Sequence, residues 1–228
     1  MGRTRSAVLA LLTLLPLAAA TPVAAADVHV PRGARAVATP FVPPFSSTIE
    51  PVTAADLSAS WRPGCPVGPE QLRLLTVSTV DFAGRPAFGQ IVVHADVAAG
   101  VVAIFERLHA LRYPIARMTP VEAYGGSDDA SMAADNTSAF NCRATTGGTG
   151  FSEHSYGTAI DLNPVENPYV KGSTVLPEAG RAFVDRKPAP GVVLAGDAVV
   201  QAFAEHGFSW GGDWNSLKDY QHFSVSGD

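Results

Sequence analysis

The sequence has little positive charge, few cysteines and no second long apolar run. Each of these shortages argues against a class of protein. Lys and Arg number 16 against 21 Asp and Glu, a net charge of −5, which argues against a surface built for nucleic acid. Two cysteines are too few for a disulfide-rich scaffold or for a four-cysteine zinc site. No second apolar run long enough to span a membrane follows the first one.

What remains is the composition of a globular protein with a hydrophobic core. Hydrophobic residues make up 46% of the 228 residues and charged residues 16%. This balance excludes a disordered or fibrous chain. The length is sufficient for one good domain and too short for several.

The first 26 residues have the order of a secretory signal peptide. Arg3 and Arg5 form a basic start, an apolar run extends from Ala7 to Ala20, and small residues then reach Ala26. We expect cleavage after Ala26, with Ala20 as the second choice, and a secreted, extracellular mature chain. The alternative is a retained N-terminal anchor, for which the apolar run is short.

A proline-rich segment follows the predicted signal peptide. Residues 27–56 carry several prolines among Ser, Thr and Ala, and neither a helical nor a strand period is present. This pattern predicts a flexible or extended leader. The folded domain is expected to span residues 57–228.

The two cysteines, Cys65 and Cys142, both lie in the domain that is predicted to be exported. Export places them in an oxidising compartment, where we expect them to form a disulfide. Closing this long loop would restrain the unfolded chain and stabilise the fold by about 2–4 kcal/mol. The alternative is that one of the cysteines is a reactive nucleophile.

Hydrophobic patterning predicts strands mixed with a few helices. Residues 72–82 and 89–94 are predicted to form a hairpin, and Asp96 is expected to cap the helix that follows. Because no βαβ rhythm and no internal repeat is present, we expect an α+β fold, a single domain with a mainly antiparallel sheet flanked by helices. The remaining expectations are short strands at 115–124, 158–162, 208–210 and 221–225, a helix at 197–206, and irregular chain at 125–133 and 163–190.

Two histidines and an aspartate have the residue types of a zinc site. A catalytic zinc takes three protein ligands and keeps a fourth position for water, and His154, Asp161 and His222 can supply such a set. His154 and Asp161 are seven residues apart, so on one regular strand they would face opposite sides. Gly157 is placed to turn the chain between them. A carboxylate on a buried strand also requires a cation or hydrogen-bond donors.

Asp219 and His222 form an acid-x-x-His pair, which can bring a free carboxylate beside the water of a metal held by His222. The carboxylate would accept a proton from that water and give it to the leaving amine afterwards. Taken alone, each signal has a plainer interpretation. His154 is then a surface or hydrogen-bonded histidine, Asp219 a solvated loop acid, and residues 210–214 a tight turn with two packed aromatics.

Together these segments resemble the zinc D-alanyl-D-alanine carboxypeptidase and L-alanyl-D-glutamate endopeptidase family of peptidoglycan peptidases, whose fold is Hedgehog-like. The resemblance extends over residues 72–223, and residues 210–214 are similar to a Trp-Gly-Gly-Asp-Trp segment of the phage-endolysin-like branch. The family signature, Ser-x-His-x-x-Gly-x-Ala-x-Asp followed by acid-x-x-His, is matched at Ser152, His154, Gly157, Ala159, Asp161, Asp219 and His222.

The resemblance implies a metal centre with a separate acid. The zinc site would lie on the sheet, with Zn²⁺ as the cofactor and Asp219 as the general acid/base. The three residues that would hold the zinc ion are His154, Asp161 and His222.

The resemblance also implies residues that contact the substrate. Ser152 would contact the ligands or the substrate, and we assign Trp210 and Asp213 to substrate contact. The family uses an upstream arginine to steady the oxyanion. Residues 124–127 contain no arginine, so Arg143 is the substitute. The alternative for Arg143 is a surface arginine beside the disulfide.

We therefore expect a cell-wall-associated, monomeric zinc metallopeptidase that hydrolyses peptidoglycan stem peptides and binds no nucleic acid. Carboxypeptidase and endopeptidase action both remain open. The alternative is a non-catalytic zinc-containing module of the same fold that binds wall peptide or a partner, as Hedgehog domains use the site without demonstrated peptidase chemistry. The free acid at Asp219 favours catalysis. A calcium- or carbohydrate-binding wall module would explain the acidic charge but not the histidine pair.

Overall fold

The described part of the molecule, taken from a computed structural model, comprises residues 41–145 and 148–227. The predicted signal peptide, residues 1–26, lies outside the described residues, and so does the part of the predicted leader up to residue 40. The described residues all belong to one compact unit. Within the described residues, no helix is both long enough and apolar enough to cross a membrane.

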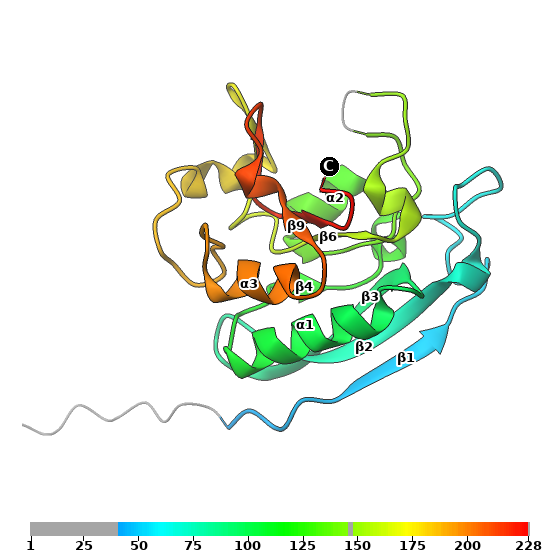
Figure 1. The fold of residues 1–228 in the computed structure, drawn as a ribbon, viewed down its shortest axis with the longest axis horizontal. Helices are drawn as coiled ribbons and strands as arrows, with labels where there is room; N and C mark the ends of the chain where they lie inside the picture. Colours follow the sequence, from blue (N-terminus) through cyan, green and yellow to red (C-terminus); the bar gives the residue numbers. More distant parts are fainter. Residues whose placement is uncertain (1–40, 146–147, 228) are drawn as a thin grey trace, which may run out of the picture. The chain divides into compact units, whose positions relative to one another are not determined.

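The longest sheet has three antiparallel strands in the order β1–β2–β3, and α1 packs against it (Figure 1). β2 (Leu72–Val80) and β3 (Pro86–His94) form the predicted hairpin, and α1 (Ala98–Ala110) follows it. Apolar residues recur along α1 at helical spacing and are buried in the same core cluster as the inner side chains of β2 and β3. Burial of this face holds the helix on the sheet.

The first strand of this sheet lies inside the predicted leader. β1 (Ser47–Pro51) pairs with β2 from Ser47 opposite Val77 to Pro51 opposite Arg73. All five of its residues are exposed, so no apolar alternation marks the strand in the sequence, and backbone pairing to β2 defines it. These positions lie inside the segment that was predicted to be a flexible or extended leader, and they are extended.

The helix α1 also begins later than predicted. Val97 occupies the N-cap position, and its side chain makes no capping hydrogen bond. Asp96 does not cap it, because its carboxylate lies in the preceding turn, 3.5 Å from Nδ1 of His94.

A second sheet of three short antiparallel strands, in the order β6–β11–β9, carries the candidate site. α3 packs beside it, and the ring of Phe203 on α3 stacks on Phe223 of β11 with 3.8 Å between the centroids. Both rings belong to the core cluster that also holds the inner face of α1, so one core joins the two sheets. The bounds are β6 (Ala159–Asp161), β9 (Ser209–Trp210), β11 (His222–Ser224) and α3 (Ala198–Ala204).

The third sheet has the order β10–β7–β8 and lies partly in chain that was predicted to be irregular. β7 (Tyr169–Lys171) and β8 (Thr174–Leu176) form a tight hairpin, and β10 (Lys218–Asp219) pairs with β7. Three-residue strands are too short to show a period, which is why the pattern of the sequence concealed them.

The remaining elements are short. Residues 125–133 were predicted to be a loop, but α2 (Asp128–Ala133) forms there, with Ser127 Oγ accepting a hydrogen bond from the backbone N–H of Ala130. The structure confirms the α+β class, with antiparallel sheets and few helices. The other short elements are η1 (Pro69–Gln71), β4 (Arg117–Met118), η2 (Val121–Tyr124), β5 (Asn136–Thr137), η3 (Glu153–Tyr156), η4 (Glu178–Phe183) and η5 (Gly211–Asp213).

The predicted disulfide between Cys65 and Cys142 is present, with the two Cα atoms 6.0 Å apart. Cys142 is buried in a second apolar cluster beneath β2 and β3, which includes Leu72 and Val92. The disulfide therefore joins the chain before β2 to the segment that leads into the candidate site.

Candidate metal centre

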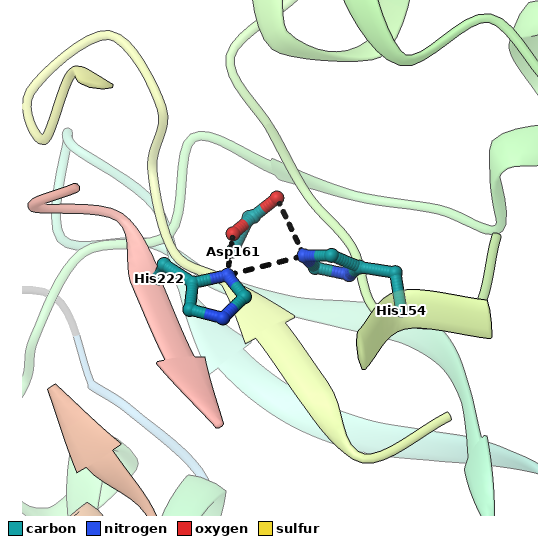
Figure 2. Close-up of side chains that lie close together, drawn as sticks. All are labelled: His154, Asp161 and His222. Carbon is teal, nitrogen blue, oxygen red and sulfur yellow. Dashed lines mark hydrogen bonds and ion pairs between the residues drawn. The ribbon is translucent and has the colours of Figure 1, made fainter. Parts of the chain in front are cut away.

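Three short elements bring His154, Asp161 and His222 to one point (Figure 2). Asp161 is the last residue of β6 and His222 the first of β11, and the two are directly paired across the strands. Directly opposed residues of antiparallel strands present their side chains on the same face of the sheet. His154 reaches the same point from η3.

Gly157 makes the turn that allows His154 and Asp161 to face one another. It ends η3 with a φ of +71°, in the left-handed region that favours glycine. A Cβ atom at this position would lie 2.7 Å from the backbone nitrogen of His94. Both the backbone conformation and the close approach to β3 therefore require glycine here, as the spacing of the two ligands predicted.

The spacing of the ligand atoms fits a tetrahedral metal ion. Nε2 of His154 lies 3.1 Å from Oδ2 of Asp161 and 3.2 Å from Nδ1 of His222, and that Nδ1 lies 3.2 Å from Oδ1 of Asp161. Ligands placed about 2.0–2.2 Å from a tetrahedral zinc ion are roughly 3.3–3.6 Å from one another. These distances involve both carboxylate oxygens of Asp161. One ligand atom from each of the three residues lies within 4.8 Å of the other two, so this cluster could hold a metal ion.

The two imidazole rings are held by neighbouring groups. Nδ1 of His154 lies 2.7 Å from the carbonyl oxygen of Ala139, so Nδ1 donates its proton there and Nε2 is the nitrogen that faces the centre. Outer hydrogen bonds of this kind fix the tautomer of metal-binding histidines. The ring of His222 packs against Trp214, with 5.4 Å between the centroids.

Asp161 is held in its ionised form. Burial acts to raise the pKa of its carboxyl group, but His154 and His222 outweigh that effect and hold the pKa below its ordinary value. A metal ligand must be a carboxylate rather than a carboxylic acid, so the two histidines keep Asp161 in the form that binds a cation.

Asp219 lies beside this cluster with a carboxyl oxygen that has no partner. Its Oδ1 atom is buried and makes no hydrogen bond within the described residues. Burial raises the pKa of Asp219 to about 7, although His222 acts in the opposite direction. Buried polar atoms are nearly always hydrogen-bonded, so the orphaned oxygen indicates a ligand or water beside it. A group that titrates near neutrality suits proton transfer.

Gly211 allows Asp219 and His222 to lie where they do. A Cβ atom at position 211 would lie 2.6 Å from the carbonyl oxygen of Asp219 and 3.3 Å from Cβ of His222. At the next position, a Cβ on Gly212 would lie 2.3 Å from the ring of Trp210. The two glycines of the Trp-Gly-Gly-Asp-Trp segment are therefore explained by close packing beneath the site.

A cavity of about 370 Å³ opens onto the three ligands and Asp219. Ser152 and Arg143, both predicted to belong to the site, line this cavity. Ser152 is the N-cap of η3, and its Oγ accepts a hydrogen bond from the backbone N–H of His154. The hydroxyl group therefore helps to set the position of the first ligand.

Arg143 is paired with an acid that the sequence analysis did not identify. Its Nη2 atom lies 3.0 Å from Oδ2 of Asp128 on α2, and both side chains line the cavity. Burial raises the pKa of Asp128, and Arg143 acts against that change. Arg143 is thus a fixed part of the cavity wall. The alternative prediction, a surface arginine beside the disulfide, does not describe this position.

Trp210 and Asp213 are not brought to this cavity. Trp210 is buried in the core, where its Nε1–H donates to the carbonyl oxygen of Tyr220 over 2.8 Å. Asp213 is exposed and borders a separate hollow together with Trp210. The member of the segment that lines the metal cavity is Trp214. The assignment of Trp210 and Asp213 to substrate contact therefore stays a prediction, and Trp214 borders both hollows.

Several wall residues carry no signal in the sequence. Tyr169 and Lys171 reach the cavity from β7, a strand that was not predicted, and Asp128 reaches it from α2. Gln221 also lines the cavity, next to His222, and its position beside a predicted ligand was the only available clue.

A buried cluster of two histidines and one aspartate, with a separate carboxyl group in an adjoining cavity, is typical of metal-dependent hydrolases. Residues 145–225 match the family described as D-alanyl-D-alanine carboxypeptidase. The matched segment contains His154, Asp161, Asp219 and His222, whereas Arg143 lies just before it. The resemblance to the zinc D-alanyl-D-alanine peptidase family that the motifs predicted is thus confirmed over residues 145–225. No solved structure gives a significant match.

Proposed function

We propose that the protein is an exported zinc metallopeptidase that hydrolyses stem peptides of peptidoglycan. The observation that carries the proposal is the buried His154–Asp161–His222 cluster beside Asp219, whose Oδ1 atom has no hydrogen-bond partner among the described residues. A purely structural metal site does not require an additional buried acid such as Asp219. A buried carboxyl oxygen without a hydrogen-bond partner lowers the stability of the fold. The family match supports the same class of reaction.

The donor set fits zinc, and the residues that would hold the ion are His154, Asp161 and His222. When bound, a zinc ion supplies Lewis-acid activation of water and of the scissile carbonyl group. Asp219 would accept the proton of the attacking water at its unpartnered Oδ1 atom. It would then deliver this proton to the leaving amine, which cannot depart as an anion near neutral pH.

Arg143 would steady the negative charge that develops on the scissile carbonyl oxygen. It lines the same cavity as the metal cluster, and Asp128 fixes the direction of its guanidinium group through the 3.0 Å ion pair. Donors that are already oriented stabilise a developing oxyanion without reorganising during the reaction. Ser152, which positions His154 through the backbone, lines the same cavity.

Export to the cell wall is part of the proposal. The signal-peptide pattern of residues 1–26 supports it, and the disulfide between Cys65 and Cys142 is of the kind found in oxidising compartments. The proposed substrate also lies outside the membrane. Detection of the mature chain in culture medium or wall fractions, beginning at Asp27, would test this element separately from the chemistry.

The chemical test uses purified protein from Asp27 to Asp228 and defined stem peptides. Products are identified by mass spectrometry, with and without a chelator and with zinc restored afterwards. Loss of one terminal D-alanine establishes carboxypeptidase action, and a cut between L-Ala and D-Glu establishes endopeptidase action. If the folded, zinc-loaded protein binds these peptides and cleaves none, it is a binding module and the proposed function is wrong.

A further inference from the structure

Two cationic side chains line the metal cavity, and they differ in how their charge is compensated. Arg143 is paired with Asp128 over 3.0 Å. Lys171 is exposed, and within the described residues its ammonium group makes neither a hydrogen bond nor an ion pair. The charge of Arg143 is thus compensated by Asp128, although its buried Nε–H has no partner among the described residues, whereas the charge of Lys171 is available to an anionic group of a ligand.

Strand pairing places Lys171 on the wall that adjoins the proposed general acid. Asp219 on β10 is directly paired with Tyr169 on β7. Lys171 is two residues further along β7, and residues i and i+2 of a strand lie on the same face. Tyr169 and Lys171 accordingly both line the cavity. The backbone of Lys171 is about 7 Å along the strand from Tyr169, a distance that its four-carbon side chain can span in either direction.

The two candidate substrates share an anionic group at one position. In a D-Ala-D-Ala terminus, the residue on the amine side of the scissile bond carries the terminal carboxylate. In an L-Ala–D-Glu bond of a stem peptide, D-Glu continues the chain through its γ-carboxyl group and retains a free α-carboxylate. In both substrates the carboxylate lies one residue beyond the bond that is cleaved, roughly 3.3–3.6 Å along the chain.

We infer that Lys171 is a specificity-determining residue that binds the α-carboxylate of the substrate residue on the amine side of the scissile bond. This inference rests on the proposed function and deepens it, because it names the group that the cavity recognises. Two further acids of the cavity wall, Glu153 and Asp219, favour this placement, because they repel a carboxylate that is not met by a cation. Lys171 is the cation of this cavity wall that has no partner of its own among the described residues.

Binding measurements separate recognition from catalysis. The zinc-loaded Asp219→Asn variant, which is expected to be inactive, is titrated by calorimetry with an acylated D-Ala-D-Ala peptide acid and with the corresponding C-terminal amide. A second pair presents L-Ala–D-Glu with its α-carboxyl group free or amidated. We expect the acid to bind roughly 10- to 100-fold more tightly than the amide in the pair that matches the natural substrate, the range of a hydrogen bond to a charged group.

Substitutions at Lys171 then test the contact itself. Lys171→Met should reduce the preference for the acid to near unity while leaving amide binding unchanged, and Lys171→Arg should restore it. Lys187→Met is the matched control, because Lys187 is exposed and does not line the cavity. In the active protein, Lys171→Met should raise the KM for the acid, whereas the kcat/KM for the amide should stay constant.

The inference would be overturned if the protein with Lys171 intact bound the acid and the amide equally well. It would also be overturned if Lys171→Met lowered the affinity for both peptides by the same factor. These results differ from a failure of the proposed function, which would leave both peptides uncleaved by the wild-type protein. A protein that prefers the acid through Lys171 but cleaves neither peptide would support carboxylate recognition and contradict the peptidase.

Discussion

Asp161 and His222 lie directly opposite one another in the antiparallel pair β6–β11, with 3.2 Å between the carboxylate Oδ1 and the imidazole Nδ1. Because side chains alternate along a strand, a slip of one residue would turn one of them to the other face. Phe223, the next residue of β11, packs on Phe203 in the core and thereby fixes the register. The metal centre and the core are therefore specified by the same strand pairing.

Removal of either histidine should abolish metal binding. In His154→Ala or His222→Ala, two protein ligands remain, and zinc bound per chain should fall from near one to near zero after dialysis. Zinc added to the wild-type protein should raise its Tm, because a ligand that binds only the folded state stabilises it. This shift should vanish in both variants and persist in His206→Ala, an exposed histidine beyond α3. Retained zinc in either ligand variant would contradict the assignment.

Removal of the acid should separate metal binding from turnover. Asp219→Ala should keep one zinc per chain and should lose about 10²- to 10⁴-fold in kcat, the usual contribution of a positioned acid or base. Asp185→Ala serves as the control, because Asp185 is a highly exposed acid outside the cavity. Steady-state kinetics on the preferred stem peptide and metal analysis of the same samples provide the comparison. Normal turnover by Asp219→Ala would show that another group transfers the proton.

Gly157 and Gly172 offer a matched test of the turn between the first two ligands. Both have positive φ, +71° and +58°, but a Cβ would meet the backbone of His94 at position 157 and open space at position 172. Gly172→Ala should lower the free energy of unfolding by about 1 kcal/mol, the cost of left-handed backbone. Gly157→Ala should lower it by roughly a further 1–3 kcal/mol, as in overpacked interiors, and should weaken zinc binding. Urea titration checks both values, and equal losses would refute the packing argument.

Stability should decline with pH because of Glu166, a carboxyl group away from the metal centre. Burial, followed by the nearby charge of Asp135, raises its pKa from 4.5 to about 8. Since the folded pKa is the higher one, this stabilising contribution is complete below pH 4.5 and is lost as the pH rises to about 8. Glu166→Gln should flatten this part of the stability profile, and Glu205→Gln, at an exposed site, should not. Chemical denaturation between pH 4 and 9 provides the comparison, and an unchanged slope in Glu166→Gln would contradict the assignment.

The sequence predicted the centre of the site because its residues have fixed chemical roles and short spacings. His154, Gly157 and Asp161 lie within a segment of eight residues, so a local turn is sufficient to bring the two ligands together. The structure contains that turn at Gly157. His222 was placed by its motif rather than by periodicity. The pairing of β6 with β11, which brings it to Asp161, is a contact across 61 residues that local patterning does not encode.

The wall of the cavity was not predictable in the same way. Lys171 and Tyr169 belong to a three-residue strand, and Asp128 belongs to a six-residue helix, and neither element is long enough to show a period. Trp210 and Trp214 occur in one motif, yet one packs in the core and the other borders the cavity. This difference depends on the direction in which each side chain points in the folded chain. Residue type and spacing do not determine that direction.

The central claim is that one metal ion is held by His154, Asp161 and His222 while Asp219 stays outside its ligand set. Anomalous X-ray scattering at the zinc edge, from crystals of the zinc-loaded protein, tests this claim most directly. The account predicts a single strong peak about 2.0–2.2 Å from Nε2 of His154, a carboxylate oxygen of Asp161 and Nδ1 of His222. A peak elsewhere, or one in which Asp219 replaces a predicted ligand, would contradict it.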